Sequence, residues 1–521
     1  MRCSKHVVTL LLATFVASIG FAPIQSSALT TLEDDLKAFH DNPKEFLNRV
    51  PQKKTVATTQ QIEDQNQESN QVQIFNQQEI KSRSFIKSKT KWRKSFLQEN
   101  MSASESYDPS EPMPNDIADN LVDNQVTMRM LGEMDLAGLK SASLPFQPFS
   151  GDYWAMYKGI LGARNYDGVF PQGQDWSLKF DYITQNPFMS VFSARNISAI
   201  NTLSPSEKYD LLIGDTDGIF TQVQWKKGET YWRSSKNVES WMGICEGWAA
   251  SSFNMPRPQQ AVITTAFDGI TPIKFNPAEL KGLTAYQWST TRYPFKFVGG
   301  RCNVTNPKTD SKGRIIDKNC LDTNPATWHL TAVNQIGVGR RSFIMDATFD
   351  YQVWNQPVYS YKYVYFNPVT LEQTDSLQDA MIPRKSYKND KFKKYRSSKA
   401  THYVGIAMDV VYVSLVGNST SDVDSPAHDQ MTEVKYLYDL ELDESGNIIG
   451  GEWYNNRHPD FIWVPAKGVF PRTAADAQIA LSEWDGSTAL PTKWQELARA
   501  NARSGKILSS IVEVLFNRAQ R

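Results

Sequence analysis

A change in composition near residue 140 divides the 521-residue chain into two unlike parts. Residues 29–140 are rich in Gln, Asn, Ser, Lys and Glu and show no sustained apolar periodicity. Such a segment buries too little apolar surface to offset the entropy lost on ordering, so we expect a largely disordered linker or prosegment. Residues 141–521 contain most of the 14 Trp and 21 Tyr, and we expect them to form the folded domain.

Strand patterns dominate residues 141–521, with helices near both ends of that region. Ser204, Pro205 and Glu207 fit the start of a helix, and Pro491–Phe516 contains an amphipathic helical stretch. The predicted fold class is therefore α+β. The remaining predicted elements are two short helices, Leu32–Phe39 and Asn120–Leu136, the strands Thr327–Val333, Ser342–Asp346, Tyr361–Phe366 and Val410–Leu415, and the hairpin Glu433–Leu442 with Ile448–Tyr454.

Residues 1–28 have the layout of a secretory signal peptide. Arg2 and Lys5 precede the apolar stretch Val7–Ala22, and Ala28 ends a small-residue motif of the kind that signal peptidase cleaves. An uncleaved membrane anchor is the alternative, but about 16 apolar residues are few for a membrane span. We therefore expect a secreted protein, extracellular or periplasmic, with no membrane span after cleavage.

Three cysteines remain once the signal peptide is removed, an odd number for an oxidising compartment. Cys302 and Cys320 flank a polar loop, and a disulfide between them would stabilise the fold by about 3 kcal/mol in the chain-entropy model. Cys245 then stays outside the disulfide. Such a thiol is either buried and inert or kept reduced for chemistry.

The residues around Cys245 favour a chemical role. Gly243 permits a tight turn before the cysteine, and Glu246–Phe253 is compatible with a helix. A thiol at a helix N-terminus has a lowered pKa, because the helix dipole and the first N–H groups favour the thiolate. The same N–H groups can face a developing oxyanion.

A cysteine nucleophile needs a base, and a base needs an orienting group. His329 lies in the strand-like segment Thr327–Val333, and Asp346 ends the next predicted strand. Two adjacent strands could present His329 and Asp346 side by side, which would complete a catalytic triad with Cys245. A core histidine bonded to the backbone is the alternative for His329, and Asp350 is a weaker alternative to Asp346.

These residues resemble the papain-like transglutaminase core, in which a helix-start Cys precedes a strand His and an Asp-x-Thr like Asp346–Thr348. More specifically, Gly243–Trp248 resembles the nucleophile motif of the oomycete transglutaminase elicitors, and Val353–Val358 resembles their surface peptide. The resemblance covers roughly residues 145–470. It implies an antiparallel sheet packed with helices.

The resemblance implies a protein-glutamine gamma-glutamyltransferase that joins glutamine to lysine or other primary amines through a cysteine thioester. Carried over, Cys245 is the nucleophile, His329 the base and Asp346 the orienting group. A papain-like cysteine hydrolase, either a peptidase or a glutamine deamidase, is the alternative, because it shares the triad. Aromatic walls that exclude water would favour attack on the thioester by an amine over attack by water. The candidates nearest in sequence are Trp241, Trp248 and Trp328, and simple core packing is the alternative for each.

The peptide Val353, Trp354, Asn355, Gln356, Pro357 and Val358 has two interpretations. The resemblance implies an exposed elicitor motif recognised by host immunity. Its position after the Asp346 strand favours a structural role first. The signal peptide and the long prosegment have the general layout of that family. We predict a zymogen, in which the glutamine-rich prosegment partly blocks the site until cleavage within or after the basic run Lys87–Lys94. A linker or secretion spacer is the alternative.

Calcium is implied by the resemblance alone, and the sequence suggests no organic cofactor. The acidic loop Gly417–Pro426, with Asp422, Asp424 and nearby His428, could hold calcium but lacks EF-hand spacing. A solvated loop is the alternative. The chain has 56 basic and 56 acidic residues, so its charge gives no case for a nucleic-acid partner. The implied partners are proteins that carry Gln and Lys.

Overall fold

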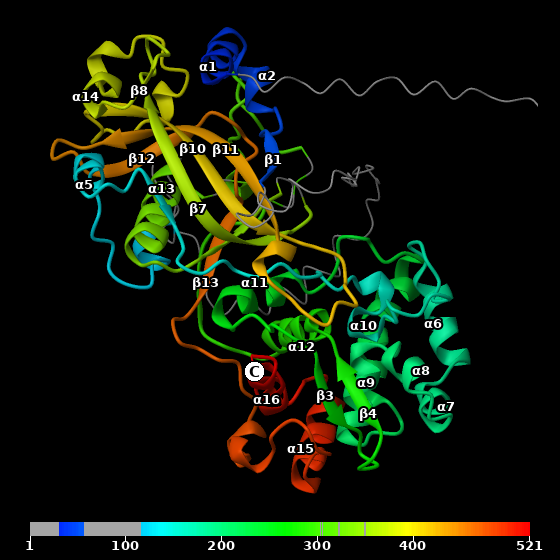
Figure 1. Ribbon diagram of the computed structural model, residues 1–521. Coiled ribbons are helices and arrows are strands. Elements are labelled where there is room, and N and C mark those ends of the chain that lie inside the picture. The colour runs from blue at the N-terminus through cyan, green and yellow to red at the C-terminus, as the bar shows by residue number, and fades with distance from the viewer. Residues whose placement is uncertain are drawn as a thin grey trace, which may run out of the picture.

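A computed structural model (Figure 1) describes residues 31–56, 116–302, 304, 306–320, 323–348 and 351–520. An antiparallel sheet forms one end of the molecule, and a group of helices forms the other. The predicted α+β class, with an antiparallel sheet packed with helices, is confirmed. No helix among the described residues is both long enough and apolar enough to cross a membrane.

The large sheet has its strands in the order β1-β11-β10-β7-β6-β13-β5, and every neighbouring pair is antiparallel. Three long central strands contain the predicted strands 361–366 and 410–415 and the first arm of the predicted hairpin. The strands on this path are β1 (Lys53–Val56), β5 (Phe295–Gly299), β6 (Ile344–Asp346), β7 (Asn355–Phe366), β10 (His402–Ser414), β11 (Gln430–Leu442) and β13 (Phe461–Pro465). Shorter strands pair beside them: β2 (Ser141–Ser143), β8 (Gln373–Thr374), β9 (Ile382–Pro383) and β12 (Ile448–Trp453).

The helical end of the molecule includes a separate two-stranded ribbon, β3 (Val262–Thr265) with β4 (Pro272–Phe275). The predicted C-terminal helical stretch forms two helices, because Gly505 between them has a φ of 72°. The helices here are α6 (Trp176–Gln185), α7 (Phe188–Ser193), α8 (Ile197–Asn201), α9 (Pro205–Ile213), α10 (Ile219–Ser235), α11 (Cys245–Asn254), α12 (Pro277–Thr290), α15 (Thr492–Arg503) and α16 (Ser509–Arg518).

Helix α9 begins as the sequence predicts. Ser204 is its N-cap, and Pro205 occupies the first turn. The Ser204 hydroxyl accepts from the Glu207 N–H and the Glu207 carboxylate accepts from the Ser204 N–H, which completes a capping box. The buried Arg164 guanidinium also pairs with the Glu207 carboxylate at 2.6 Å. A local capping signal and a buried ion pair thus fix the same helix start.

Residues 31–56 are packed on the domain, which differs from the disorder predicted for the 29–140 segment. Helix α1 (Leu32–Asp41) confirms the predicted helix 32–39 and is followed by α2 (Pro43–Leu47). Leu36 and Phe39 are fully buried, and the Phe39 ring stacks on Tyr454 at 4.2 Å. Strand β1 then pairs with the edge of β11.

Residues 116–140 are also part of the fold, so the predicted boundary at 141 does not mark the start of ordered structure. Instead of one helix over 120–136, this stretch forms a 3-10 turn, Ala118–Asn120, and helix α5 (Leu131–Leu136). Leu121 and Leu131 are buried in the core beneath the sheet. The predicted signal peptide, the Gln/Asn-rich tract and the basic run 87–94 lie outside the described residues.

The segment predicted as a strand over 327–333 is helical. Helix α13 (Pro325–Thr331) continues into a π-helical turn, Ala332–Val338, and packs against β11 and β12. The Asn324 side chain accepts from the Ala326 N–H, and Pro325 occupies the first helical position. This start signal outweighs the alternating apolar pattern that suggested a strand. By contrast, β6 confirms the predicted strand that ends at Asp346.

Two apolar cores meet near helix α11. One fills the space among α9, α10, α11, α12, α15 and α16, and the other lies between the sheet and α13. Helix α11 packs against α12 on one side and against β7 on the other, so its N-terminus lies where helices and sheet join. The predicted disulfide Cys302–Cys320 is present. Short helix α14 (Leu377–Ala380) borders the far end of the sheet.

Candidate active site around Cys245

Cys245 is the first residue of helix α11, as the sequence predicts, and only 3% of it is exposed. Two glycines allow this placement. A Cβ at Gly243 would lie 2.3 Å from the Tyr153 carbonyl oxygen, and a Cβ at Gly247 would lie 1.9 Å from that of Ala285 in α12. Only glycine permits backbones to approach so closely, so both residues hold the helix N-terminus in position.

Two partners of the Cys245 sulfur come from the start of β7 and from the residues just before it. The Asn355 Nδ2 donates to Sγ at 3.5 Å, and Sγ lies 3.7 Å from the Val353 carbonyl oxygen. The Trp463 Nε1 donates to the Asn355 Oδ1 at 2.8 Å. Because a tryptophan N–H can only donate, this bond fixes the amide orientation and directs its N–H₂ group toward the sulfur.

Asp346 lies beside Asn355 on the neighbouring strand β6. The two residues are direct partners in the antiparallel register, so their side chains share one face of the sheet. Backbone bonds from Ala347 to Trp354 and from Val358 to Phe343 alternate along the ladder, which makes 346 and 355 a non-hydrogen-bonded pair. Side chains approach most closely in such pairs, so Asp346, Asn355 and Cys245 form one buried group.

The Asp346 carboxylate is held through one oxygen. Its Oδ1 accepts from the Trp354 N–H at 3.0 Å and from the Thr348 hydroxyl at 2.8 Å, whereas its buried Oδ2 has no hydrogen-bond partner among the described residues. Burial raises the pKa of the Asp346 carboxyl to about 6, although those hydrogen bonds and the Arg301 charge act to lower it. A buried carboxylate with an unused oxygen can exchange a proton near neutral pH.

The structure does not bring His329 to this group. Its ring packs against Tyr363 at 4.8 Å, and its Nδ1 lies 2.9 Å from the Tyr438 hydroxyl. Tyr363 is eight residues beyond Asn355 on β7. At a rise of about 3.3 Å per residue, about 25 Å of strand separates them. The predicted side-by-side placement of His329 and Asp346 on adjacent strands is therefore wrong.

The surroundings of His329 are also unsuited to proton exchange with Cys245. The residue is fully buried, and burial lowers the pKa of its imidazole to about 3. The ring is therefore neutral across the physiological range. In this structure His329 is a core histidine of the aromatic cluster under the sheet, as in the alternative interpretation, but its ring bonds the Tyr438 hydroxyl where that interpretation had a backbone group. The weaker Asp346 alternative, Asp350, lies outside the described residues.

The three predicted cleft tryptophans have different positions. Trp241 lies four residues before Cys245, packs edge-on against Tyr351 at 5.9 Å and lies beneath Arg301, whose charge acts on Asp346. Trp248 is buried inside the helical core, where its Nε1 bonds the Phe149 carbonyl. Trp328 packs against Tyr436 in the other core. Only Trp241 has contacts that connect it to the Cys245 group.

The segment Val353–Val358 is mostly buried, unlike the exposed elicitor peptide that the resemblance implies. Val353, Asn355, Gln356, Pro357 and Val358 are buried, and Trp354 is partly buried against Tyr153 at 5.1 Å. Its backbone forms the start of β7 beside β6. The structural role that the sequence favoured first is the one that these contacts support, since the segment positions Asn355 and the Val353 carbonyl at Cys245.

The acidic loop 417–426 does not fit a calcium site. Asp422 pairs with Lys274 at 2.7 Å, and Asp424 pairs with Arg257 at 2.9 Å and with Lys281 at 2.7 Å. Calcium needs several oxygen ligands whose charge is not already balanced by protein cations. Among the described residues, no cluster of three or more His, Cys, Asp or Glu side chains could hold a metal ion.

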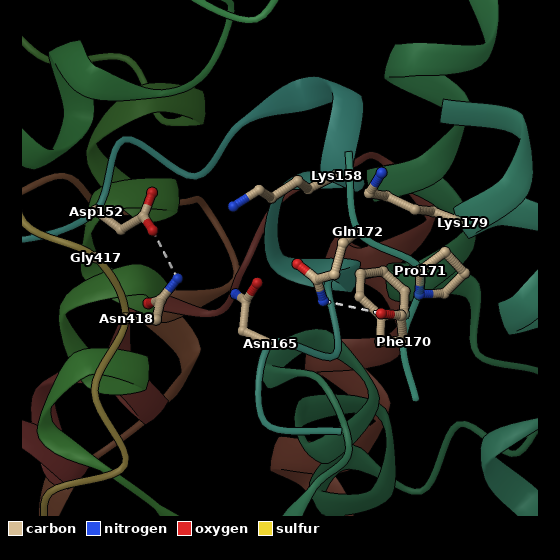
Figure 2. Close-up of a pocket in the computed structure, with 9 residues that line it drawn as sticks. All are labelled: Asp152, Lys158, Asn165, Phe170, Pro171, Gln172, Lys179, Gly417 and Asn418. Atoms are coloured by element: carbon tan, nitrogen blue, oxygen red, sulfur yellow. Dashed lines mark hydrogen bonds between the residues drawn. The ribbon is translucent and has the colours of Figure 1, made fainter. Parts of the chain in front are cut away.

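A polar pocket lies next to the Cys245 group without including it (Figure 2). It shares the segment 151–154 with the site, since Tyr153 contacts the turn before Cys245 whereas Asp152 faces the pocket. The Asn418 Nδ2 donates to the Asp152 carboxylate at 2.7 Å. The residues that line the pocket are Asp152, Lys158, Asn165, Phe170, Pro171, Gln172, Lys179, Gly417 and Asn418.

Sequence reasoning missed the roles of Asn355, Trp463 and Tyr153. Asn355 was assigned to a recognition peptide, and the other two carried no signal at all. The adjacency of Asn355 and Asp346 follows from the hairpin between β6 and β7, so a predicted tight hairpin after Asp346 could have revealed it. Trp463 reaches the site from β13, more than one hundred residues away, and no local pattern predicts that contact.

The site thus combines a buried cysteine at a helix N-terminus with an amide and a carboxylate from an antiparallel sheet, the types of group that nucleophilic cysteine chemistry uses. The chain matches the transglutaminase elicitor family over residues 124–489, and it belongs to that family. It is also similar to the crystal structure of the GP42 transglutaminase from Phytophthora sojae. That match has 20% identity and a TM-score of 0.43, and it covers 67% of this chain and 88% of the other. No curated protein sequence matches this chain.

Proposed function

We propose that this protein is a transglutaminase that transfers the γ-glutamyl group of a protein glutamine to a lysine or another primary amine. The observation that carries the proposal is the buried group of Cys245, Asn355 and Asp346, in which an oriented amide N–H₂ lies 3.5 Å from the sulfur. Membership of the transglutaminase elicitor family supports this reaction class. The group supplies the nucleophile, a hydrogen-bond donor and a proton acceptor that acyl transfer requires.

The first step is formation of the Cys245 thiolate. The N-terminus of α11 favours negative charge on the sulfur, and Asn355 donates to it. Asp346 takes the thiol proton through its unused Oδ2, directly or through one water. Asp346 thus takes the role of the base, which the sequence analysis had assigned to His329.

In the second step, the thiolate attacks the glutamine carboxamide carbon and forms a C–S bond. The Asn355 N–H₂ and the first N–H groups of α11 lie on the side where the carbonyl oxygen gains negative charge. The C–N bond breaks, and protonated Asp346 gives its proton to the departing ammonia. A primary amine then attacks the thioester carbon and gives one proton to the Asp346 carboxylate. A C–N bond forms, and the C–S bond breaks to leave the Cys245 thiolate.

We further propose that the chain is exported, because residues 1–28 have the pattern of a cleaved signal peptide. The Cys302–Cys320 disulfide is consistent with an oxidising compartment. Calcium dependence stays a prediction from the resemblance, and the reaction steps above use only residues of this chain.

The test is incorporation of a labelled primary amine into a glutamine-rich protein, measured with calcium and with a chelator. Cys245→Ala should abolish incorporation, and Asp346→Asn should lower it by roughly 10²–10⁴-fold, the usual contribution of a positioned base. Above pH 6 the wild-type rate should approach a plateau as Asp346 ionises. Ammonia release without amine incorporation would identify a deamidase instead. Equal incorporation by wild type and Cys245→Ala would refute the proposal.

A further inference from the structure

Strand β1 brings a lysine of the N-terminal segment to the Cys245 group. Its register with β11 runs from Lys53 opposite Val434 to Val56 opposite Met431. The Lys53 Nζ donates to the Ala347 carbonyl oxygen at 2.9 Å, although the two residues are 294 positions apart. Ala347 directly follows Asp346, so the chain brings one of its own ammonium groups to the backbone carbonyl next to the proposed catalytic residue.

The opposite face of β1 differs from the Lys53 face. Lys54 points to the other side of the sheet, where its Nζ pairs with the Glu433 carboxylate at 2.6 Å. Successive side chains of a strand alternate between its faces, so these two adjacent lysines lie on opposite faces of β1. Of these two lysines, only Lys53 lies on the face of β1 that is directed toward Ala347, so Lys54 is the natural control for it.

Side chains hold β1 only weakly on the sheet. Lys53, Lys54 and Thr55 are exposed, and Val56 is partly buried. Strand β12 covers the outer edge of β11 at residues 438–442, so β1 alone covers the edge at 431–434 among the described residues. An edge strand held by backbone bonds and few buried contacts opens at low free-energy cost.

We propose that the outer edge of β11 at Met431–Val434 is the binding site for the acyl acceptor, an extended protein segment that carries a lysine. This segment adds to the sheet edge in place of β1 and presents its lysine where Lys53 lies now. The proposal rests on the proposed transglutaminase activity and names its second substrate. Strand addition at a sheet edge binds through main-chain hydrogen bonds and therefore accepts many sequences, as a cross-linking enzyme needs.

Attack of the bound lysine on the thioester requires that its ammonium group lose two protons, and groups at this position can accept both. The lysine ammonium, held by the Ala347 carbonyl, first loses one proton to the Asp346 carboxylate. Its Nζ attacks the thioester carbon, a C–N bond forms, and the C–S bond to Cys245 breaks. The second amine proton passes to the departing thiolate, and Asp346 releases its proton to water. Lys53 occupies this place in the resting chain and so competes with acceptor lysines.

The first test compares Lys53→Met with the control Lys54→Met in the full chain. Lys53→Met removes the competing ammonium, and the hydrogen bond of a charged donor corresponds to roughly a tenfold change. The KM for a labelled small primary amine should therefore fall by up to about tenfold in Lys53→Met, with kcat little changed, and stay unchanged in Lys54→Met. Equal KM values in the two variants would overturn the proposal.

The second test locks β1 onto β11 with cysteines at the paired positions Thr55 and Thr432, as Thr55→Cys with Thr432→Cys. When oxidised, this variant should lose use of a lysine-containing peptide but still release ammonia from a glutamine peptide, because water needs no sheet edge. Reduction should restore the lysine peptide, and wild type in the same oxidant and reductant is the control. Undiminished use of the peptide by the oxidised form would contradict the proposal.

These tests separate the acceptor site from the underlying activity. If wild type releases no ammonia from a glutamine peptide, or if Cys245→Ala releases as much, then the proposed function fails. If ammonia release depends on Cys245 and the locked form still uses the lysine peptide, only the acceptor site at the β11 edge fails.

Discussion

At the scale of single residues, Asn355 has the most defined role. Its amide connects Trp463 to Cys245, with both contacts buried, and Trp463 fixes which end faces the sulfur. A donor held by a partner keeps its direction while charge develops on the substrate, which is how preorganised groups lower a barrier.

We predict that Asn355→Ala lowers the rate of amine incorporation by about 10²–10³-fold, the usual cost of losing one oxyanion donor. Asn355→Asp places a second carboxylate beside the sulfur and should raise the pKa of the Cys245 thiol. Iodoacetamide alkylation of Cys245, followed by mass spectrometry across pH, measures that pKa. An unchanged alkylation profile in Asn355→Asp would mean that the two side chains do not meet.

The buried histidines have a predictable effect on acid stability. Burial lowers the pKa of His458 to about 3, and its ring stacks on Trp453 at 4.6 Å. In the unfolded chain His458 therefore becomes protonated below about pH 6.5, whereas in the folded chain it stays neutral down to about pH 3. The free energy of unfolding consequently falls as pH drops from 6.5 toward 3.

His458→Phe keeps the stacking and removes the titration. Between pH 7 and pH 5, urea denaturation should show that wild type loses about 2 kcal/mol more stability than His458→Phe. The same substitution at His428, whose side chain is 51% exposed, is the matched control for the change of residue type. A His458→Phe variant that loses stability as steeply as wild type would disprove the effect.

At the scale of elements, the packing of α11 on α12 determines where Cys245 lies. Gly247 is in the first turn of α11 and touches the α12 backbone at Ala285. A Cβ at this position could not be accommodated by a side-chain movement, because the atom that it would meet is the backbone carbonyl oxygen of Ala285.

We predict that Gly247→Ala destabilises the fold by several kcal/mol, in the range of severe overpacking, and displaces Cys245. Thermal unfolding and the alkylation rate of Cys245 should both change. Gly168→Ala is the matched control, because a Cβ there meets no atom within 4 Å. A Gly247→Ala protein with the melting temperature of Gly168→Ala would contradict the close helix contact.

The predictability of the elements depended on how local their signals are. The helix start at Cys245, the strand that ends at Asp346 and the capped helix at Ser204 each follow from adjacent residues and were predicted. The segment 327–333 was predicted as a strand because its apolar residues alternate or run together as in a strand, whereas Asn324 and Pro325 begin a helix. The position of His329 relative to Cys245 depends on which end of β7 each one contacts, and sequence spacing does not encode that.

At the scale of the whole molecule, the N-terminal segment is partly a structural element. The composition of 29–140 predicted a spacer, yet α1 contributes Leu36 and Phe39 to a buried cluster with Phe392 and Tyr454. Short packed stretches inside a polar segment barely change its average composition. Inhibition by the prosegment stays a prediction. A chain that begins near residue 140 would also lose the packing of Leu36 and Phe39.

We predict that Phe39→Ala in the full chain costs about 3–5 kcal/mol, the usual cost of a large-to-small change in a core. Phe146→Ala is the control, because Phe146 is 85% exposed and should change stability by less than about 0.5 kcal/mol. Thermal unfolding compares the two variants. Equal melting temperatures would show that residues 31–56 are not an integral part of the domain.

The most direct test of the account is to trap the acyl-enzyme. The protein is mixed with a glutamine peptide without amine, quenched in acid, digested, and mapped by mass spectrometry. We expect the peptide, less ammonia, as a thioester on Cys245, absent in Cys245→Ala and much reduced in Asp346→Asn, whereas His329→Gln still forms it if it folds. An adduct on another residue, or one that forms equally in Cys245→Ala, would contradict the assignment of this site.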